Sequence, residues 1–168
     1  MLTEGQSSYL AKIPENTPAD IRPWDREVAE YARNLVKKIK SEVGLEVFWG
    51  GSLALEIIGQ NDIDLSIFAE PEDFEKYLPK ISQLLGKPTY NLDDSVLWRV
   101  HKDGHKVDAS LMSKTNPGVM RDIFFFNSLK NNPTLLGEYV ALKTSGISAR
   151  DYYISKNEFY NRVTENWR

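Results

Sequence analysis

The 168-residue sequence contains no cysteine and no long apolar run. Without cysteine the chain has no disulfide scaffold, no thiolate metal site and no cysteine nucleophile. No apolar run approaches the roughly 18 residues that a membrane-spanning helix needs. The first 20 residues also lack the basic start and apolar centre of a signal peptide. We therefore expect a cytoplasmic protein with no membrane partner.

An excess of basic charge is absent too. The formal net charge is −3, and no basic run is long enough to mark a nucleic-acid surface. The composition therefore disfavours a long nucleic acid as a partner. Hydrophobic residues make up 41% and charged residues 27% of the chain, as in ordinary globular proteins. The length predicts one domain over residues 1–168.

The order of patterns along the chain divides this domain into three parts. Prolines recur in the first part and predict an extended N-terminal arm over residues 1–23. Residues 24–116 alternate between strand-like and helix-like segments, which predicts an α/β core on a small mixed sheet. Residues 117–168 are helical in character. The expected fold class is therefore α+β, with helices flanking the sheet and a helical C-terminal part packed against it.

Periodicity and end signals predict the individual elements. Helical spacing and capping signals favour helices over residues 28–39, 52–58, 71–86, 119–132, 133–146 and 149–167. Strand-like runs occupy residues 45–49, 62–69 and 95–112. The last run has Asp103-Gly104 at its centre, which is typical of a hairpin with a type I′ turn.

Three acidic residues in predicted strands form the first candidate site. Asp62 and Asp64 are two residues apart, so a strand projects both from one face. They could be a solvated edge, but two close carboxylates repel each other unless a cation lies between them. Mg²⁺ prefers oxygen ligands and is commonly held by one or two carboxylates together with substrate phosphates. Asp108, on the second hairpin strand, is either a solvated residue or a third ligand. Three such acids could hold two ions for phosphoryl or nucleotidyl transfer.

A glycine-rich turn precedes these acids. Gly50, Gly51 and Ser52 follow a predicted strand directly and open a predicted helix. Glycine lets the backbone approach a phosphate closely, and the start of a helix favours an anion. Ser52 could cap the helix or donate its hydroxyl to a phosphate oxygen. Arg99, on the first hairpin strand, is either a surface charge or a further phosphate contact.

The spacing of these residues resembles the signature of the DNA polymerase β-type nucleotidyltransferase superfamily. In that signature a hydrophobic strand leads into Gly-Gly or Gly-Ser. About ten residues later comes Asp-hydrophobic-Asp-hydrophobic, in which Glu can replace the second Asp. Here Gly51-Ser52 is followed, after nine residues, by Asp62-Ile63-Asp64-Leu65. Asp108 falls where the superfamily places its third carboxylate. The resemblance implies a small sheet with flanking helices, a nucleoside triphosphate substrate and two Mg²⁺ ions held by the three acids.

The C-terminal part is similar to the GrpB-like group of that superfamily. Residues 121–143, RDIFFFNSLKNNPTLLGEYVALK, share its Arg-Asp, Asn-Pro and Glu-Tyr-x-x-Leu-Lys pattern, and a later Tyr…Lys…Phe lies in residues 152–163. This similarity implies that Lys143 and Lys156 contact the triphosphate. The alternative for both lysines is an ordinary solvated position on a helix.

These observations together predict a Mg²⁺-dependent nucleotidyltransferase that moves a nucleoside monophosphate from a triphosphate to an acceptor hydroxyl. Asp62 and Asp64 would bridge the ions and phosphates, and Asp108 would help to deprotonate the acceptor. One alternative is a catalytically inactive GrpB-like module that binds nucleotide or a regulatory partner. A third hypothesis is a toxin–antitoxin component. The acceptor, the preferred base and the oligomeric state are left open.

Overall fold

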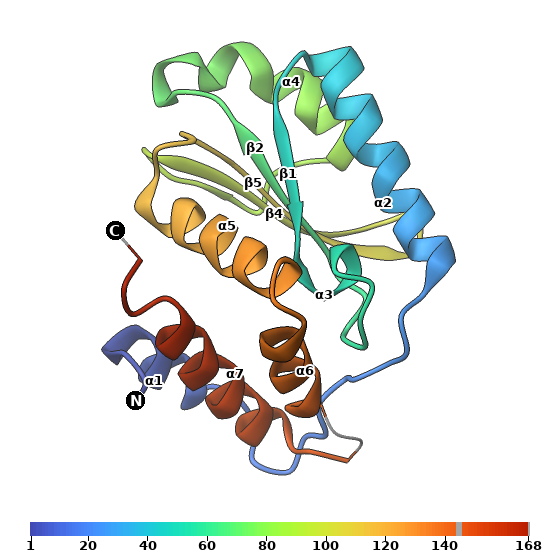
Figure 1. The fold of residues 1–168 in the computed structure, drawn as a ribbon. Coiled ribbons are helices and arrows are strands. Elements are labelled where there is room, and N and C mark those ends of the chain that lie inside the picture. Colours follow the sequence, from blue (N-terminus) through green and yellow to red (C-terminus); the bar gives the residue numbers. More distant parts are fainter. Residues whose placement is uncertain (144–145, 168) are drawn as a thin grey trace.

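A five-stranded mixed sheet organises the computed structural model, which describes residues 1–143 and 146–167 (Figure 1). The strand order is β1-β2-β5-β4-β3. The strands are β1 (Val47–Gly50), β2 (Ile63–Phe68), β3 (Tyr90–Asn91), β4 (Ser95–Lys102) and β5 (His105–Met112). β2 and β5 pair in parallel, and the other neighbours are antiparallel. The predicted α+β class with a small mixed sheet is confirmed; β3 was not predicted.

Two helices cover one face of the sheet. They are α2 (Arg26–Lys38), which continues into a π-helical turn over Ile39–Val43, and α4 (Phe74–Leu85), which follows a 3₁₀ turn over Pro71–Asp73. Alternation along the strands directs every second side chain toward these helices. The main core therefore forms here, and its fully buried members include Ile39, Ile63, Ile67, Trp98 and Leu111.

Three C-terminal helices, α5 (Pro117–Lys130), α6 (Pro133–Ala141) and α7 (Ala149–Val163), form a second layer. Figure 1 shows α5 crossing the sheet on the side away from α2 and α4. Phe126 of α5 packs edge-on against Phe48 of β1, with ring centroids 5.3 Å apart. Leu129, Tyr139 and Phe159 form a separate small core among the three helices.

The starts of these helices follow from their capping residues. The side chains of Asn116, Asn132 and Ser148 each accept hydrogen bonds from backbone amides in the first turn. Proline occupies the first position of α5 and of α6, where its missing amide costs nothing. The predicted helix over residues 133–146 ends at Ala141, and residues 144–145 of that prediction lie outside the described residues.

The hairpin between β4 and β5 turns at the predicted residues. Asp103 and Gly104 have φ angles of 52° and 83°. A type I′ turn needs positive φ at both central residues, which Asp and Gly tolerate well. This turn fixes the register of β4 against β5, and so determines which residue lies opposite Asp108.

The prediction of a wholly extended N-terminal arm is wrong for residues 4–10, which form helix α1 (Glu4–Leu10). Thr3 and Gln6 form a capping box at its start. Tyr9 packs on Tyr153 of α7, with ring centroids 5.1 Å apart. Isolated helices this short are marginal, so the docking on α7 stabilises α1, and that contact has no local sequence signal.

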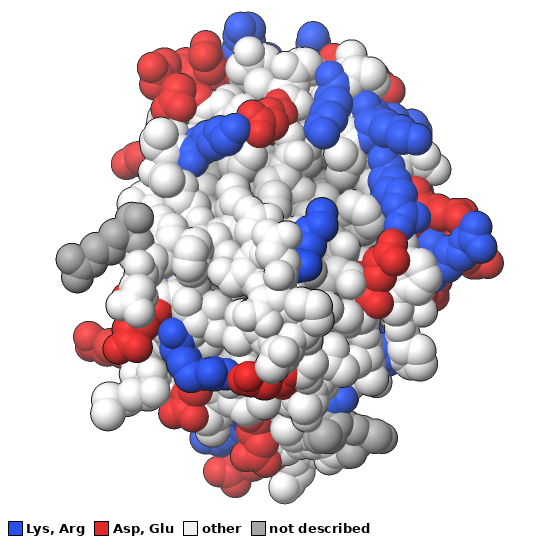
Figure 2. Space-filling model, in the orientation of Figure 1, with Lys and Arg blue, Asp and Glu red and all other residues white. Residues whose placement is uncertain are grey.

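The molecular surface carries charges of both signs. On the face shown in Figure 2, basic and acidic side chains both lie around the rim, basic ones gather at the upper right, and much of the centre is uncharged. Among the described residues, no helix combines the length and apolar character needed to cross a membrane.

Candidate functional site

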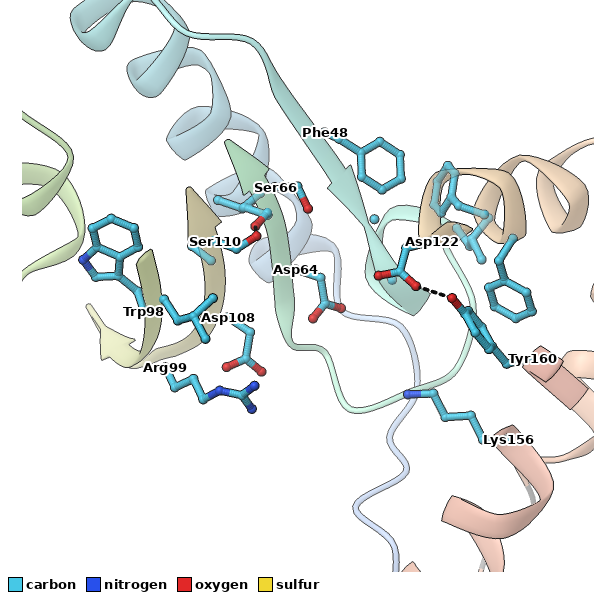
Figure 3. A pocket seen from close by; sticks show the side chains of 18 of the residues that line it. Phe48, Asp64, Ser66, Trp98, Arg99, Asp108, Ser110, Asp122, Lys156 and Tyr160 are labelled. Carbon is cyan, nitrogen blue, oxygen red and sulfur yellow. Dashed lines mark hydrogen bonds between the residues drawn. The ribbon is translucent and has the colours of Figure 1, made fainter. Parts of the chain in front are cut away.

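A cleft of about 630 Å³ lies between the open face of the sheet and helices α5 and α7 (Figure 3). The face of β2 and β5 that does not enter the core lines this cleft with Asp64, Ser66, Asp108 and Ser110. These side chains are only partly buried, whereas their neighbours Ile63, Leu65 and Val107 lie in the core. Asp64 and Asp108 can therefore occupy strands whose other face is buried, because their own face borders the cleft.

Asp64 and Asp108 lie directly opposite each other in the parallel register of β2 and β5. Within the described part of the chain, the buried Oδ1 of Asp108 has no hydrogen-bond partner. Burial raises the pKa of Asp64 to about 6; Lys156 opposes this shift, and the nearby charges of Asp62 and Asp108 add to it. The two carboxylates form a concentrated negative charge at the floor of the cleft.

Asp62, the third predicted acid, points elsewhere. Its Oδ2 accepts a hydrogen bond of 2.6 Å from Nζ of Lys106, and the same ammonium lies 3.6 Å from Oδ2 of Asp108. Asp62 and Lys106 line a second cleft, of about 680 Å³, whereas Asp64 and Asp108 line the first. In residues 1–143 and 146–167, no three acidic or imidazole side chains gather closely enough to hold a metal ion. The structure therefore brings together two of the three predicted acids.

The glycine turn adjoins Asp64, as its spacing predicted. Gly50 pairs with Asp64 in the antiparallel register of β1 and β2. Gly51 has a φ of 77°, and a Cβ added to it would collide with the carboxylate of Asp64. Glycine is required at position 51 both for its backbone conformation and for this close approach.

Ser52 does not have the predicted capping role. The helix that follows, α3 (Gly51–Ala54), is shorter than the predicted residues 52–58, and its N-cap is Gly50, with no side-chain cap. Oγ of Ser52 instead accepts a hydrogen bond of 2.7 Å from Nζ of Lys143. A four-residue helix has little dipole, so any anion here would depend mainly on side chains and on individual amides.

Lys143 is a buried residue, not the solvated helix position considered above. It follows α6, is 4% exposed, and donates a second hydrogen bond of 3.0 Å to the hydroxyl of Tyr152. Its ammonium lies over the rings of Tyr139 and Tyr152, 4.6 and 5.5 Å from their centroids. Burial lowers the pKa of Lys143 to about 7; Lys156 adds to this shift and Asp64 opposes it.

The two remaining predicted cations face the cleft. Arg99 lies opposite Asp108 in the register of β4 and β5. Lys156 reaches toward the acids from α7, on the other wall (Figure 3). Its positive charge is the largest influence that opposes the raised pKa of Asp64. Both cations are exposed and accessible to an anionic ligand.

Asp122 and Tyr160 belong to the same cleft and were not predicted. The hydroxyl of Tyr160 donates a hydrogen bond of 2.7 Å to Oδ1 of Asp122 (Figure 3). Burial raises the pKa of Asp122, while the bond from Tyr160 and the charges of Lys156 and Arg121 oppose the shift. The Arg-Asp pair at 121–122 was part of the C-terminal similarity, but nothing in its pattern indicated a cleft position.

Asp64→Asn is expected to stabilise the metal-free protein above about pH 6. The raised pKa means that the native state binds more protons than the unfolded state between 3.8 and about 6. Stability therefore falls as pH rises through that window, and the cost persists at higher pH. Thermal unfolding in a chelator should show a gain of about 1–3 kcal/mol near neutral pH, vanishing near pH 4. Asp93→Asn, on the exposed turn between β3 and β4, is the control and should show no such pH dependence.

Comparisons with known proteins give a likeness of fold. The sequence matches no protein-family model and no curated protein. Among solved structures, the chain is similar to Cid1, a protein with RNA terminal uridylyl transferase activity, at a TM-score of 0.46 and 12% sequence identity. The match covers 82% of this chain and 46% of the Cid1 chain, so this chain spans less than half the length of that structure.

Proposed function

We propose that this protein is a nucleotidyltransferase that moves a nucleoside monophosphate from a triphosphate to an acceptor hydroxyl. The observation that carries the proposal is the pairing of Asp64 with Asp108 across the parallel strands, beside the glycine turn at Gly51. Paired carboxylates next to a close backbone approach suit a substrate that brings both phosphates and divalent cations.

The donor set fits Mg²⁺. Asp64 and Asp108 supply hard oxygen ligands from adjacent strands, and the buried Oδ1 of Asp108 lacks a partner among the described residues. These two residues would hold the metal, and Asp62 would join them if its side chain turned from Lys106. A bound divalent cation would offset phosphate charge and make an acceptor hydroxyl more acidic.

The other cleft residues have roles that follow from their positions. Arg99 and Lys156 face the acids from two walls and would contact the phosphates. Ser52 and Lys143 do not line the cleft; their hydrogen bond would hold the turn at Gly51, against which the phosphates would lie. In the transfer, the acceptor oxygen bonds to the α-phosphorus, the bond to the bridging oxygen breaks, and pyrophosphate leaves. Asp108 would take the acceptor's proton. The other residues would contribute by positioning the substrates and stabilising charge.

The experiment is turnover of labelled nucleoside triphosphates with Mg²⁺ across a panel of acceptors: nucleosides, short oligonucleotides, aminoglycosides and protein hydroxyls. Asp64→Asn and Asp108→Asn should each lower the rate by about a hundred- to thousand-fold, the scale on which loss of one charge-stabilising group acts. Asp93→Asn should leave it unchanged. Transfer that survives in both Asp64→Asn and Asp108→Asn contradicts the proposal.

Calorimetry separates this function from the inactive alternative. Mg²⁺-dependent triphosphate binding that is lost in Asp64→Asn, without turnover on any acceptor, would favour a nucleotide-binding module.

Membership of the GrpB-like group is part of the same proposal and is supported by the pattern in residues 121–143.

A further inference from the structure

We propose that Lys106 is a positioning residue: its ion pair with Asp62 holds the third carboxylate out of the acidic site until a divalent cation displaces the ammonium. The proposal rests on the proposed function, because it concerns the same metal site. It explains why Asp62, which the spacing places beside Asp64, lines a different cleft.

The position of the ammonium supports this role. Lys106 lies two residues before Asp108 on β5, so both project from the same face of the strand. Nζ of Lys106 reaches both Asp62, at 2.6 Å, and Asp108, at 3.6 Å. A single positive charge thus lies between two of the predicted metal ligands, where it offsets the repulsion that the acids would otherwise experience.

The ion pair can open at modest cost. The side chain of Lys106 is 45% exposed, so its ammonium can move into water while its stem stays on the sheet. Ion pairs near the surface contribute little net stability; here the Asp62 carboxylate is 17% exposed and the ammonium is the better solvated partner. A divalent cation carries twice the charge of the ammonium and can be bound by several carboxylates at once.

The backbone near Asp62 is fixed, so the side chain is the part that moves. Asn61 has a φ of 57°, and its Nδ2 donates a hydrogen bond of 2.9 Å to the carbonyl of Pro23 in the N-terminal segment. Ile63, on the other side, is fully buried in the core. Asp62 lies between these two anchors. In the proposal its side chain rotates away from Lys106 and toward Asp64, while the backbone stays in place.

The test is Mn²⁺ binding, measured by electron paramagnetic resonance and calorimetry, in the full chain and in four variants. Lys106→Met should raise Mn²⁺ affinity by about tenfold, and Asp62→Asn should lower it. Most of the gain from Lys106→Met should disappear in the Asp62→Asn background, because the gain comes from releasing Asp62. Lys102→Met, on the neighbouring hairpin strand, controls for loss of a positive charge.

The outcomes distinguish this proposal from the proposed function. An equal gain in both backgrounds means that Lys106 acts without Asp62, through its charge or its contact with Asp108, which overturns the positioning role. Wild-type Mn²⁺ binding with no change in Lys106→Met also overturns it but leaves the transferase proposal standing. Absence of Mn²⁺ binding in every variant also overturns it, whereas the proposed function is then decided by the turnover experiment, because substrate phosphates would complete the metal site.

Thermal unfolding gives an independent readout. Metal-free Lys106→Met should unfold at a lower temperature than wild type, because Asp62 and Asp108 lose their shared counter-charge. Saturating Mn²⁺ should remove this difference. A lower unfolding temperature that persists at saturating Mn²⁺ shows a purely structural role for Lys106 and contradicts the proposal.

Discussion

Gly51→Ala is expected to lower the proposed nucleotidyl transfer by at least about a hundred-fold, the loss that a displacement of roughly 1 Å at a reacting centre produces. The added methyl group would overlap the Asp64 carboxylate, and the φ of 77° is unfavourable for alanine. Either Asp64 or the turn must shift. The strained conformation and the displacement together should also cost about 1–3 kcal/mol of stability, measured by denaturant unfolding.

Two other glycines separate the causes. Gly104 has a φ of 83° but open space around it, so Gly104→Ala reports the conformational cost alone. Gly137 lies within α6, also in open space, and Gly137→Ala should be neutral or stabilise by about 0.5–1 kcal/mol. If Gly51→Ala costs no more than Gly104→Ala and retains activity, the contact with Asp64 does not restrict position 51.

Lys143→Met is expected to stabilise the protein by about 2–4 kcal/mol near pH 6, since each unit of pKa shift corresponds to roughly 1.4 kcal/mol. This range already allows for the loss of the hydrogen bonds to Ser52 and Tyr152, which offsets part of the gain. Methionine has a similar length and no charge to desolvate.

The pH dependence of this gain has a definite sign. Burial lowers the pKa of Lys143 from 10.5 to about 7, so the unfolded chain binds more protons than the native state between those values. Wild-type stability should therefore rise with pH across this window, and the advantage of Lys143→Met should shrink. Denaturant unfolding between about pH 6 and pH 10 measures the gap, with exposed Lys130→Met as control. A gap that is constant with pH contradicts a desolvated ammonium at position 143.

Local patterns predicted most elements, because their signals lie within a few residues. The hairpin at Asp103-Gly104 and the capped starts of α5, α6 and α7 depend on neighbouring residues alone. The capping box at Thr3 and Gln6 is a local signal for helix α1, but so short a helix depends on its contact with α7, far along the chain.

In the candidate site, too, features set by nearby residues could be predicted and features set by distant residues could not. The alternation of Asp64 with core residues, and its proximity to Gly51, could be predicted from spacing. The direction of Asp62 could not, because it depends on Lys106 from a strand that is not its neighbour in sequence. The burial of Lys143 depends likewise on Ser52, 91 residues away, which no periodicity records. Metal binding by these residues stays a prediction.

The parallel pairing of β2 with β5 makes the acidic pair a property of the whole fold. No hairpin can bring Asp64 opposite Asp108, because parallel neighbours need a long crossover, and here that connection contains α4 and β3–β4. The cluster of negative charge is therefore created only when distant segments meet, and that pairing carries the entropy cost of closing a long loop. A cation that binds both acids would recognise the assembled sheet and not its fragments, so affinity for the metal would also measure how completely the chain has folded.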